Sequence, residues 1–581
     1  MYTWSLKDLY EGYDESFAKD FNDIKQKAEL LAELAPKLNS KEDLETWLTQ
    51  ESELTKKLRT QSAFINLNMS TNATDTESSK HMGALQNVMA GLSKPSAQFK
   101  TFLVKHKDDL PTWKAESALI KEHEFILQEE LDTAQHNLSE DVEDALSKMK
   151  INASSNWNRL HSHLTSLTTI DFKGEKHTIT SLRNFAYDTD QNVRKEAYEA
   201  ELEIYTKIED SIAFSLNSIK GEVNQVSKLR QYESPLDKTL VDSRMSKKTL
   251  DALMGAIEKY TPEFRRYLKH KGKLLGHENG LPWYDLFAPF ETSNPKTYTV
   301  EESRELIVNS FSDFSKDLSD LGARAYDDKW IDFLPREGKR GGAFCMNLPQ
   351  LKQSRVMTNF DGSTSAVVTL AHELGHAYHG KKIEDHSILN TGYTMPVAET
   401  ASTFCENIVF NAALKNADKE EQLVLIENSL SDLTQIIVDI SSRYKFETEV
   451  FERRNSEFLF ADDLKEIMIQ AQKDTYGDGL DQNVLHPYMW LNKGHYYSSG
   501  LSFYNFPYAF GGLFALGLYA KFEKEGEAFV PQYEALLSAT TTASCEDVAK
   551  MANIDVEDQA FWESSLDVVV ERIDQFIELT K

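Results

Sequence analysis

The sequence has few cysteines, prolines and glycines for its length. Its 581 residues include 3 Cys, 14 Pro and 25 Gly. The cysteines Cys345, Cys405 and Cys545 are too few and too scattered for a disulfide framework or a thiolate zinc site, and we expect a cytoplasmic protein. So few chain-breaking residues argue against a β-rich fold with many turns.

Long apolar runs and an excess of basic residues are also missing. The start of the chain has no basic segment followed by an apolar one, so we expect no secretory signal. The most apolar stretch, residues 506–520, contains Pro507, Gly511 and Gly512. It is shorter than the roughly 18 residues of a membrane span, so it predicts a buried helix.

The surface charge excludes some partners. Asp and Glu outnumber Lys and Arg by 93 to 64, which gives a formal net charge of −29. Such a chain repels phosphate groups, so we expect neither a nucleic-acid nor a membrane partner. The sequence does not indicate an oligomeric state.

Helical periodicity is what the sequence does contain. Apolar residues recur at helical spacing through much of residues 15–270, for example at Leu250, Leu253 and Ile257. Gly, Pro and β-branched residues cluster only between about 283 and 370. There, residues 338–345 are typical of a loop that runs into a strand, and residues 355–360 are typical of a second strand. The pattern predicts a mainly α protein with a small sheet.

A metal-binding pattern follows the predicted sheet. Residues 372–376 read His-Glu-Leu-Gly-His. Residues four apart lie on one side of a helix, so His372 and His376 can bind one Zn²⁺ together. Glu373, next to the first histidine, can hold the metal-bound water. The apolar residues 367–371 predict that this helix is buried, and buried histidines need a polar partner.

A catalytic zinc needs a third protein ligand and one open position. One class of zinc peptidases uses a His ten residues after the first, but here that position is Lys382, and His379 stands where that class has Gly. The other main option is a Glu on a following helix. Pro396 suits the first turn of a helix that continues to residue 406, with Glu399 and Glu406 on one face.

We therefore predict Glu399 as the third ligand and Glu406 as the acceptor for a ligand imidazole N–H. The alternative is that both are solvated helix residues. His379 shares the histidine face, but a fourth ligand would close the site. We expect it to support a ligand or simply to pack. Cys405 is expected in the core.

At these positions the sequence resembles the oligoendopeptidase F branch of the thimet oligopeptidase family. Members of this family are zinc metallopeptidases of the gluzincin type. The resemblance rests on His-Glu-Leu-Gly-His-Ala-Tyr-His at residues 372–379 and on Glu-Thr-Ala-Ser-Thr-Phe-Cys-Glu-Asn at residues 399–407. Further similar segments span nearly the whole chain, at residues 4–10, 183–187, 476–481 and 495–511. This combination is far more specific than the metal-binding pattern alone.

The resemblance implies a mainly α, two-lobed, zincin-like metallopeptidase with a deep central channel and a small antiparallel sheet beside the metal-binding helix. It implies an N-terminal helical domain at residues 1–190, with an oligopeptidase F type segment at about 110–190, and a catalytic domain at residues 191–581. It also implies one Zn²⁺ per chain in a cytoplasmic endopeptidase. That enzyme hydrolyses internal bonds of short, unstructured oligopeptides.

In this family a His and two or three Tyr from a flexible loop face the substrate. The resemblance gives these roles to His495, Tyr504 and Tyr508. Phenol and imidazole N–H groups can stabilise an oxyanion, whereas the alternative is aromatic packing. A third tyrosine is not assigned, because Gly511 stands at its position and Tyr497 is only a candidate.

Two other functions remain open. A zinc carboxypeptidase of related architecture would need a cation for the terminal carboxylate, and no residue stands out for this. A non-catalytic peptide-binding protein with a structural zinc would need a closed fourth position, for which His379 is the candidate. For the endopeptidase, a strand near residues 341–344 could pair with the substrate backbone.

Overall fold

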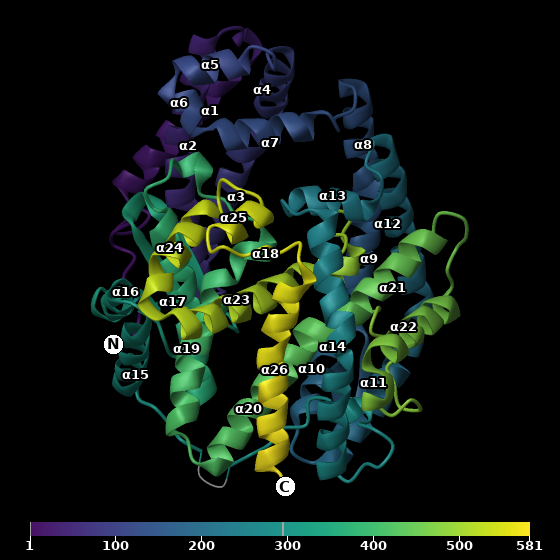
Figure 1. Ribbon diagram of the computed structural model, residues 1–581. Coiled ribbons are helices and arrows are strands. Elements are labelled where there is room, and N and C mark those ends of the chain that lie inside the picture. The colour runs from purple at the N-terminus through teal and green to yellow at the C-terminus, as the bar shows by residue number, and fades with distance from the viewer. Residues whose placement is uncertain (1, 293–294) are drawn as a thin grey trace.

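The computed structural model describes residues 2–292 and 295–581, and most of them lie in helices (Figure 1). The N-terminal helices are α1 (Glu15–Leu34), α2 (Lys41–Thr71), α3 (Thr76–Gly91), α4 (Ser93–Lys105), α5 (Leu110–Glu116), α6 (Ala118–Glu122), α7 (Glu124–Ala134), α8 (Glu140–Asn152) and α9 (Ser154–Leu167). The middle of the chain forms α10 (Ile179–Arg183), α11 (Gln191–Thr206), α12 (Glu209–Leu229), α13 (Pro235–Asp242), α14 (Lys247–Leu274), α15 (Val300–Phe314), α16 (Lys316–Asp327) and α17 (Thr364–Ile383). The remaining helices are α18 (Met395–Ala398), α19 (Thr400–Asn416), α20 (Lys419–Thr434), α21 (Ile440–Arg453), α22 (Ala461–Tyr476), α23 (Phe506–Glu525), α24 (Val530–Ala539), α25 (Cys545–Lys550) and α26 (Gln559–Leu579). The predicted mainly α fold is confirmed.

Many of these helices begin at a side chain that caps them. Asp14 accepts hydrogen bonds from the backbone N–H groups of Ser16 and Phe17 at the start of α1. Ser363 accepts one from Ala366 at the start of α17, the helix that carries the metal-binding pattern. Such caps satisfy N–H groups that have no partner within the helix, so the local sequence fixes where these helices start.

The buried hydrophobic residues form two large clusters. One runs from Leu9 to Leu127 in the N-terminal helices and also includes Leu348. The other runs from Ile170 to Phe576 and holds the rest of the fold together. Residues 170–182 therefore pack with the C-terminal part, although they precede residue 190. The domain boundary at residue 190 remains a prediction.

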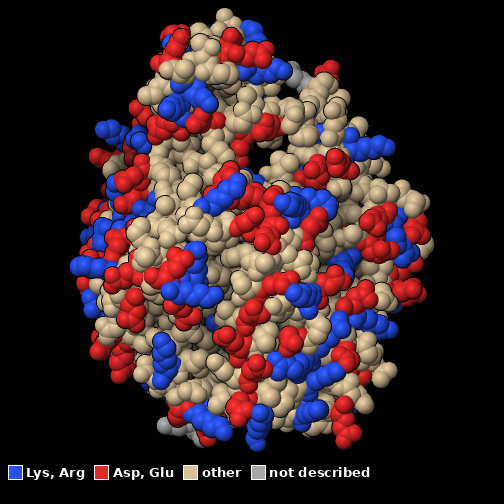
Figure 2. All heavy atoms as spheres, in the orientation of Figure 1, with Lys and Arg blue, Asp and Glu red and all other residues tan. Residues whose placement is uncertain are grey.

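The predicted two lobes and channel are also present. In Figure 1, α11, α12, α21 and α22 lie on one side and α15, α16, α17 and α24 on the other, with α23 and α26 between them. A cavity of about 930 Å³ is lined by residues at the end of α7 and by residues of α8, α12 and α13. It also reaches residues 499–504. Figure 2 shows an opening on this face, beneath α7 and beside α8.

A small sheet packs beside α17. Strand β4 (Phe344–Leu348) runs antiparallel to β5 (Gln353–Met357), which confirms the predicted pair. A third strand, β3 (Ile331–Asp332), joins β5 in parallel, in the order β3-β5-β4. The sequence did not predict β3, because two residues are too few to show a period. The Asn347 side chain donates to the backbone carbonyl of His376 at 3.1 Å and ties β4 to α17.

A hairpin interrupts the helical runs that were predicted over roughly residues 15–270. Strands β1 (Thr169–Phe172) and β2 (Glu175–Thr178) pair in antiparallel register. Lys173 and Gly174, the two residues between them, both have positive φ. Such two-residue turns match the twist of antiparallel strands. The prediction of helix over residues 15–270 is therefore wrong at this hairpin.

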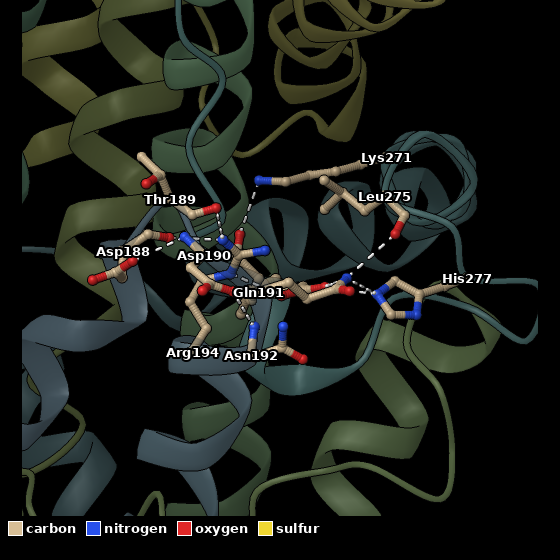
Figure 3. Close-up of polar contacts among 11 residues, drawn as sticks. Asp188, Thr189, Asp190, Gln191, Asn192, Arg194, Lys271, Leu275 and His277 are labelled. Atoms are coloured by element: carbon tan, nitrogen blue, oxygen red, sulfur yellow. Dashed lines mark hydrogen bonds and ion pairs between the residues drawn. The ribbon is translucent and has the colours of Figure 1, made fainter. Parts of the chain in front are cut away.

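A buried polar cluster joins the start of α11 to the end of α14 (Figure 3). Arg194 and His277 both contact the Asp285 carboxylate, at 2.8 and 2.6 Å. Gln191 donates to the same carboxylate at 2.7 Å and to the Leu275 carbonyl at 3.3 Å. Asp285 is completely buried, so removing its cationic partner would leave an uncompensated charge. The cluster therefore fixes these segments to each other.

The apolar stretch at residues 506–520 lies in α23, as predicted for a buried helix. Phe510, Leu513 and Phe514 of this helix are completely buried. Within the described residues, no helix has both the length and the apolar character that crossing a membrane requires.

Helices α17 and α19 approach each other closely at Gly375. A Cβ atom at this position would lie 2.5 Å from the carbonyl oxygen of Ala401 and 2.6 Å from the Cα of Ser402. These are backbone atoms, which cannot turn aside as a flexible side chain can. Only glycine fits this crossing. The crossing sets the histidine face of α17 against the segment that carries Glu399 and Glu406.

We predict that Gly375→Ala lowers the free energy of unfolding by about 1–3 kcal/mol or more, because the added methyl group forces two helix backbones apart. Gly83→Ala is the matched control. Gly83 also lies inside a helix, but a Cβ there meets nothing within 4 Å. It should raise the free energy of unfolding by about 0.5–1 kcal/mol. Urea unfolding measures both, and equal stability of the two variants would contradict the close approach.

Candidate functional site

His372, His376 and Glu399 bring their side chains together where α17 meets α19. One ligand atom of each lies within 4.8 Å of the others, and this is the only such group found among the described residues. The Nε2 atoms of His372 and His376 lie 3.2 and 3.4 Å from the Glu399 carboxylate. Two imidazoles and one carboxylate are a donor set that suits zinc with an open coordination position. We call these three residues the donor group.

Glu406 contacts the first imidazole from its other side. Its carboxylate lies 3.0 Å from Nδ1 of His372. Burial lowers the pKa of His372, but hydrogen bonds to Glu399 and Glu406 outweigh it and raise the pKa to about 10. Burial raises the pKa of Glu399, but the hydrogen bond from His372 and the charge of His376 bring it down to about 2. The two carboxylates therefore stabilise positive charge at this position.

Glu399 lies at a break between two helices. Helix α18 ends at Ala398 and α19 begins at Thr400, with Glu399 at φ −89° and ψ 5° between them. The prediction of one continuous helix from Pro396 is therefore wrong at this residue. The hydroxyl of Ser402 donates to the Glu399 carboxylate at 2.7 Å and holds it in place. The two glutamates still meet the same imidazole, one at each ring nitrogen.

Glu373 lies beside the donor group on α17. Its side chain is buried, and burial raises the pKa of its carboxyl group to about 7, with His372 acting against this shift and Glu399 adding to it. By contrast, the side chains of His372 and Glu399 each remain 25% exposed. The donor group is thus open to a ligand, and the Glu373 carboxyl group lies close enough to His372 and Glu399 for their charges to affect its pKa.

His379 is directed away from the donor group. It is completely buried, its Nε2 lies 2.8 Å from the Thr540 hydroxyl, and its ring stacks on Tyr393 at 4.2 Å. Burial, with a smaller effect of His376, lowers its pKa to about 3. In the described part of the chain, no hydrogen bond joins it to the donor group. Of the two roles expected for His379, this arrangement favours packing.

The predicted loop residues form a row that leads to Glu399. The hydroxyl groups of Tyr504 and Tyr508 lie 2.8 Å apart, and the ring of His495 lies 5.7 Å from the ring of Tyr504. Burial raises the pKa of Tyr508, and Tyr504 and the charge of Glu399 add to this shift. The structure therefore brings the three predicted residues together, with Tyr508 near Glu399.

Tyr497, the candidate for a third tyrosine, does not join this row. Tyr497 is completely buried, donates to the Trp490 carbonyl at 3.1 Å and stacks on His161 at 3.7 Å, so this candidate is a core residue. At Gly511, a Cβ would lie 3.2 Å from the Cβ of Glu399. The backbone of α23 therefore packs directly on Glu399, and a larger side chain would displace this ligand candidate.

A polar row behind the loop was not identified from the sequence. Asp439, Arg443 and Glu447 follow one another at intervals of four residues, so they share one side of α21 and of the turn before it. Glu447 accepts a hydrogen bond from the backbone N–H of Phe503 at 3.0 Å and one from Lys220 at 2.6 Å. Three charges four residues apart on one side of a helix were the available signal, because charges on a buried face need partners.

The cavity described above extends to this row of aromatic residues. Tyr504 and Pro507, which precede Tyr508, both line it. Large apolar side chains that are exposed in the structure also line it, namely Met149, Leu229, Met395 and Leu501. A ligand that reached Tyr504 through this cavity would find apolar surface to contact.

Comparison with known proteins gives a consistent result. Residues 184–568 match the model described as peptidase family M3. The chain is 24% identical to Oligopeptidase PepF of Bacillus subtilis (strain 168), over 99% of this chain and 87% of that protein. The solved structure of oligoendopeptidase-F from Enterococcus faecium matches with a TM-score of 0.72 at 18% identity, over 98% of this chain and 99% of that chain. A solved structure from Chlamydophila abortus matches with a TM-score of 0.87 at 20% identity, over 99% and 98% of the two chains.

The donor group predicts different results for the two glutamates. Glu399→Ala should abolish binding of a divalent metal, because two imidazoles alone leave it without a third ligand. Glu406→Ala should weaken binding by about 10–100-fold, because it removes only the partner of an imidazole N–H. Glu384→Ala, at the end of α17 and outside the donor group, should bind normally. Metal titration of each variant measures this, and loss of metal from Glu406→Ala alone would reverse the two roles.

Proposed function

The chain belongs to peptidase family M3, and we propose that it is a zinc-dependent endopeptidase that hydrolyses internal bonds of short, unstructured oligopeptides. The membership agrees with the resemblance to oligoendopeptidase F, which is thereby confirmed. The observation that carries the proposal is the donor group, with Glu373 next to His372 on α17 and with Tyr508, of the row from His495 to Tyr508, near Glu399. Metal ligands, a base and donors for an oxyanion are what hydrolysis of a peptide bond requires.

We propose zinc as the metal, one per chain, with His372, His376 and Glu399 as its ligands. Imidazole nitrogens and a carboxylate oxygen suit zinc better than they suit calcium or magnesium, which prefer oxygen alone. Bound there, the metal would supply a Lewis acid that polarises the scissile carbonyl group and lowers the pKa of a water molecule. Glu406 would hold the His372 ring in the orientation that this requires.

The remaining residues move the proton and stabilise the negative charge. Glu373 takes a proton from the attacking water and later gives it to the nitrogen of the leaving amine. His495, Tyr504 and Tyr508 donate hydrogen bonds to the oxyanion of the tetrahedral intermediate. The position of Tyr508 near Glu399, and the contacts of Tyr504 with Tyr508 and His495, support these roles.

Strand β4 supports binding of an extended peptide. It is an edge strand, because it pairs only with β5 within the described residues. It also lies next to α17 through the contact of Asn347 with the His376 carbonyl. An added strand gains main-chain hydrogen bonds whatever its side chains are, so this mode selects extended, unstructured peptides. The apolar side chains of the cavity supply further contacts.

The alternative of a structural zinc lacks support. It would need His379 as a fourth ligand, but that residue is bonded to Thr540 and stacked on Tyr393. A closed fourth position would also leave Glu373 without a water molecule to activate.

We predict that Glu373→Gln keeps the metal and loses activity by about 10²–10⁴-fold, because an amide cannot accept a proton from water. The ligands are unchanged, so metal content and thermal stability should match the wild type. Metal analysis beside a kcat measurement tests this. Glu384→Gln, at the C-cap of the same helix, is the control and should retain activity. Full activity of Glu373→Gln would remove this residue from the role of base.

Substrate size gives an independent test. A folded protein must unfold locally before a segment can reach a site at the bottom of a channel, and this costs free energy. One cleavable sequence can be placed in a short peptide, a long peptide and the loop of a rigid domain. We expect kcat/KM to fall steeply from the first to the last. Comparable values for all three would mean that the site lies in an open cleft.

A further inference from the structure

The side chain of Asn505 lies between a guanidinium group and an imidazole ring. Its Oδ1 accepts a hydrogen bond from Nη1 of Arg443 at 3.2 Å, and its Nδ2 lies 2.8 Å from Nε2 of His495. Asn505 itself is buried and directly precedes α23. It therefore connects the polar row on α21 with the row of His495, Tyr504 and Tyr508.

Arg443 determines which way the amide of Asn505 points. A guanidinium group has only donors, so it must face the amide oxygen. The amide NH₂ group must then face His495. Because this group donates, Nε2 of His495 has to accept and carries no proton. In a neutral imidazole the single proton then lies on Nδ1.

Arg443 is held by a further contact. It forms an ion pair with Asp439, one helical turn earlier on the same side. Asp439 is buried and ends a π-helical turn, Gln435–Asp439, between α20 and α21. Such turns are rare and frequently mark functional sites. The amide orientation thus depends on a fixed cation and not on a mobile side chain.

The chain is held at both residues that flank Tyr504. Glu447 accepts from the backbone of Phe503 on one side, and Arg443 contacts Asn505 on the other. Phe503 has a φ of 51°, which residues other than glycine rarely adopt, so the backbone at this position needs support from its neighbours. The α21 row therefore positions both the loop and His495.

The neighbourhood of His495 also excludes the doubly protonated ring. Burial lowers its pKa to about 3, and the cations Arg443, Lys220 and Lys493 act in the same direction. The acids nearby are already paired, Asp439 with Arg443 and Glu447 with Lys220. His495 is therefore neutral near pH 7, and what remains to be determined is the ring nitrogen that carries its proton.

We propose that Asn505, oriented by Arg443, holds His495 in the tautomer with the proton on Nδ1. The ring then presents an N–H donor, and not a lone pair, at its free nitrogen. No hydrogen bond within the described residues uses this Nδ1, and it is not among the buried polar atoms that lack a partner. It is thus accessible to a substrate group. Asn505 and Arg443 are positioning residues, which act through His495.

The step to catalysis rests on the proposed function. There, a donor on His495 stabilises the oxyanion, whereas a lone pair would repel it. The tautomer itself does not depend on any activity, so it can be tested separately.

The test is a ¹H–¹⁵N spectrum of the full chain labelled with ¹⁵N-histidine, which shows the ring nitrogen that carries the proton. His495 is identified by the signals that disappear in His495→Gln. We expect Nδ1–H in the wild type. Asn505→Asp keeps the contact with Arg443 but turns the donor into an acceptor, so the proton should move to Nε2.

Asn224→Asp is the matched control. Asn224 is half-buried on α12, and its side chain donates at 3.0 Å to the carbonyl of Phe451, which lies on α21 as Arg443 does. No hydrogen bond within the described residues joins Asn224 to His495. It should leave the tautomer unchanged and kcat within twofold. Asn505→Asp should lower kcat by about 10²-fold with little change in KM, because the lost donor acts on the transition state.

An Nε2–H tautomer in the wild type would overturn the proposal, whether or not Asn505→Asp folds. An unchanged tautomer in a folded Asn505→Asp would overturn it as well. If the wild type shows Nδ1–H but cleaves no peptide, the proposed function fails while the role of Asn505 stands.

Discussion

The candidate site depends on the close approach of two helix backbones, α17 and α19. Because Gly375 has no side chain, Ala401 and Ser402 rest directly on the metal-binding helix. This contact lets Glu399 and Glu406 reach opposite nitrogens of one imidazole. A second glycine, Gly511, lets α23 pack on Glu399, and Tyr508 lies in the first turn of the same helix, just after Tyr504. Two positions without side chains thus set the geometry of the carboxylate and of the aromatic row.

The two halves of the site have opposite charge. Carboxylates surround the imidazoles of the donor group and stabilise a cation there. Cations surround His495 instead and keep it neutral. A reaction that develops negative charge on an oxygen next to a metal ion needs both conditions. The carboxylates must hold the metal ion, and the nearby histidine must donate a hydrogen bond without forming an ion pair with Glu399. The polar row on α21 supplies the second condition from outside the loop.

The sequence predicted what depends on local spacing. The pair His372 and His376, the helical class, the strands beside α17 and the buried helix at 506–520 all follow from periodicity or from a short pattern. The break at Glu399 was not predicted, because it depends on how α18 and α19 pack. The contact of Arg443 with Asn505 joins residues 62 apart, so no spacing rule could identify it. The identity of the metal, the roles of the site residues, the domain boundary and the cytoplasmic location remain predictions.

The most direct test of the account is the position of the bonds that the protein cleaves. A mixture of synthetic peptides would be incubated with the purified chain, with the chain after treatment with a chelator, and with the chelated chain after zinc is restored. Mass spectrometry then identifies each product. We predict cuts at internal bonds, loss of all cuts with the chelator and recovery with zinc. Stepwise removal of C-terminal residues, or cleavage that persists without metal, would contradict it.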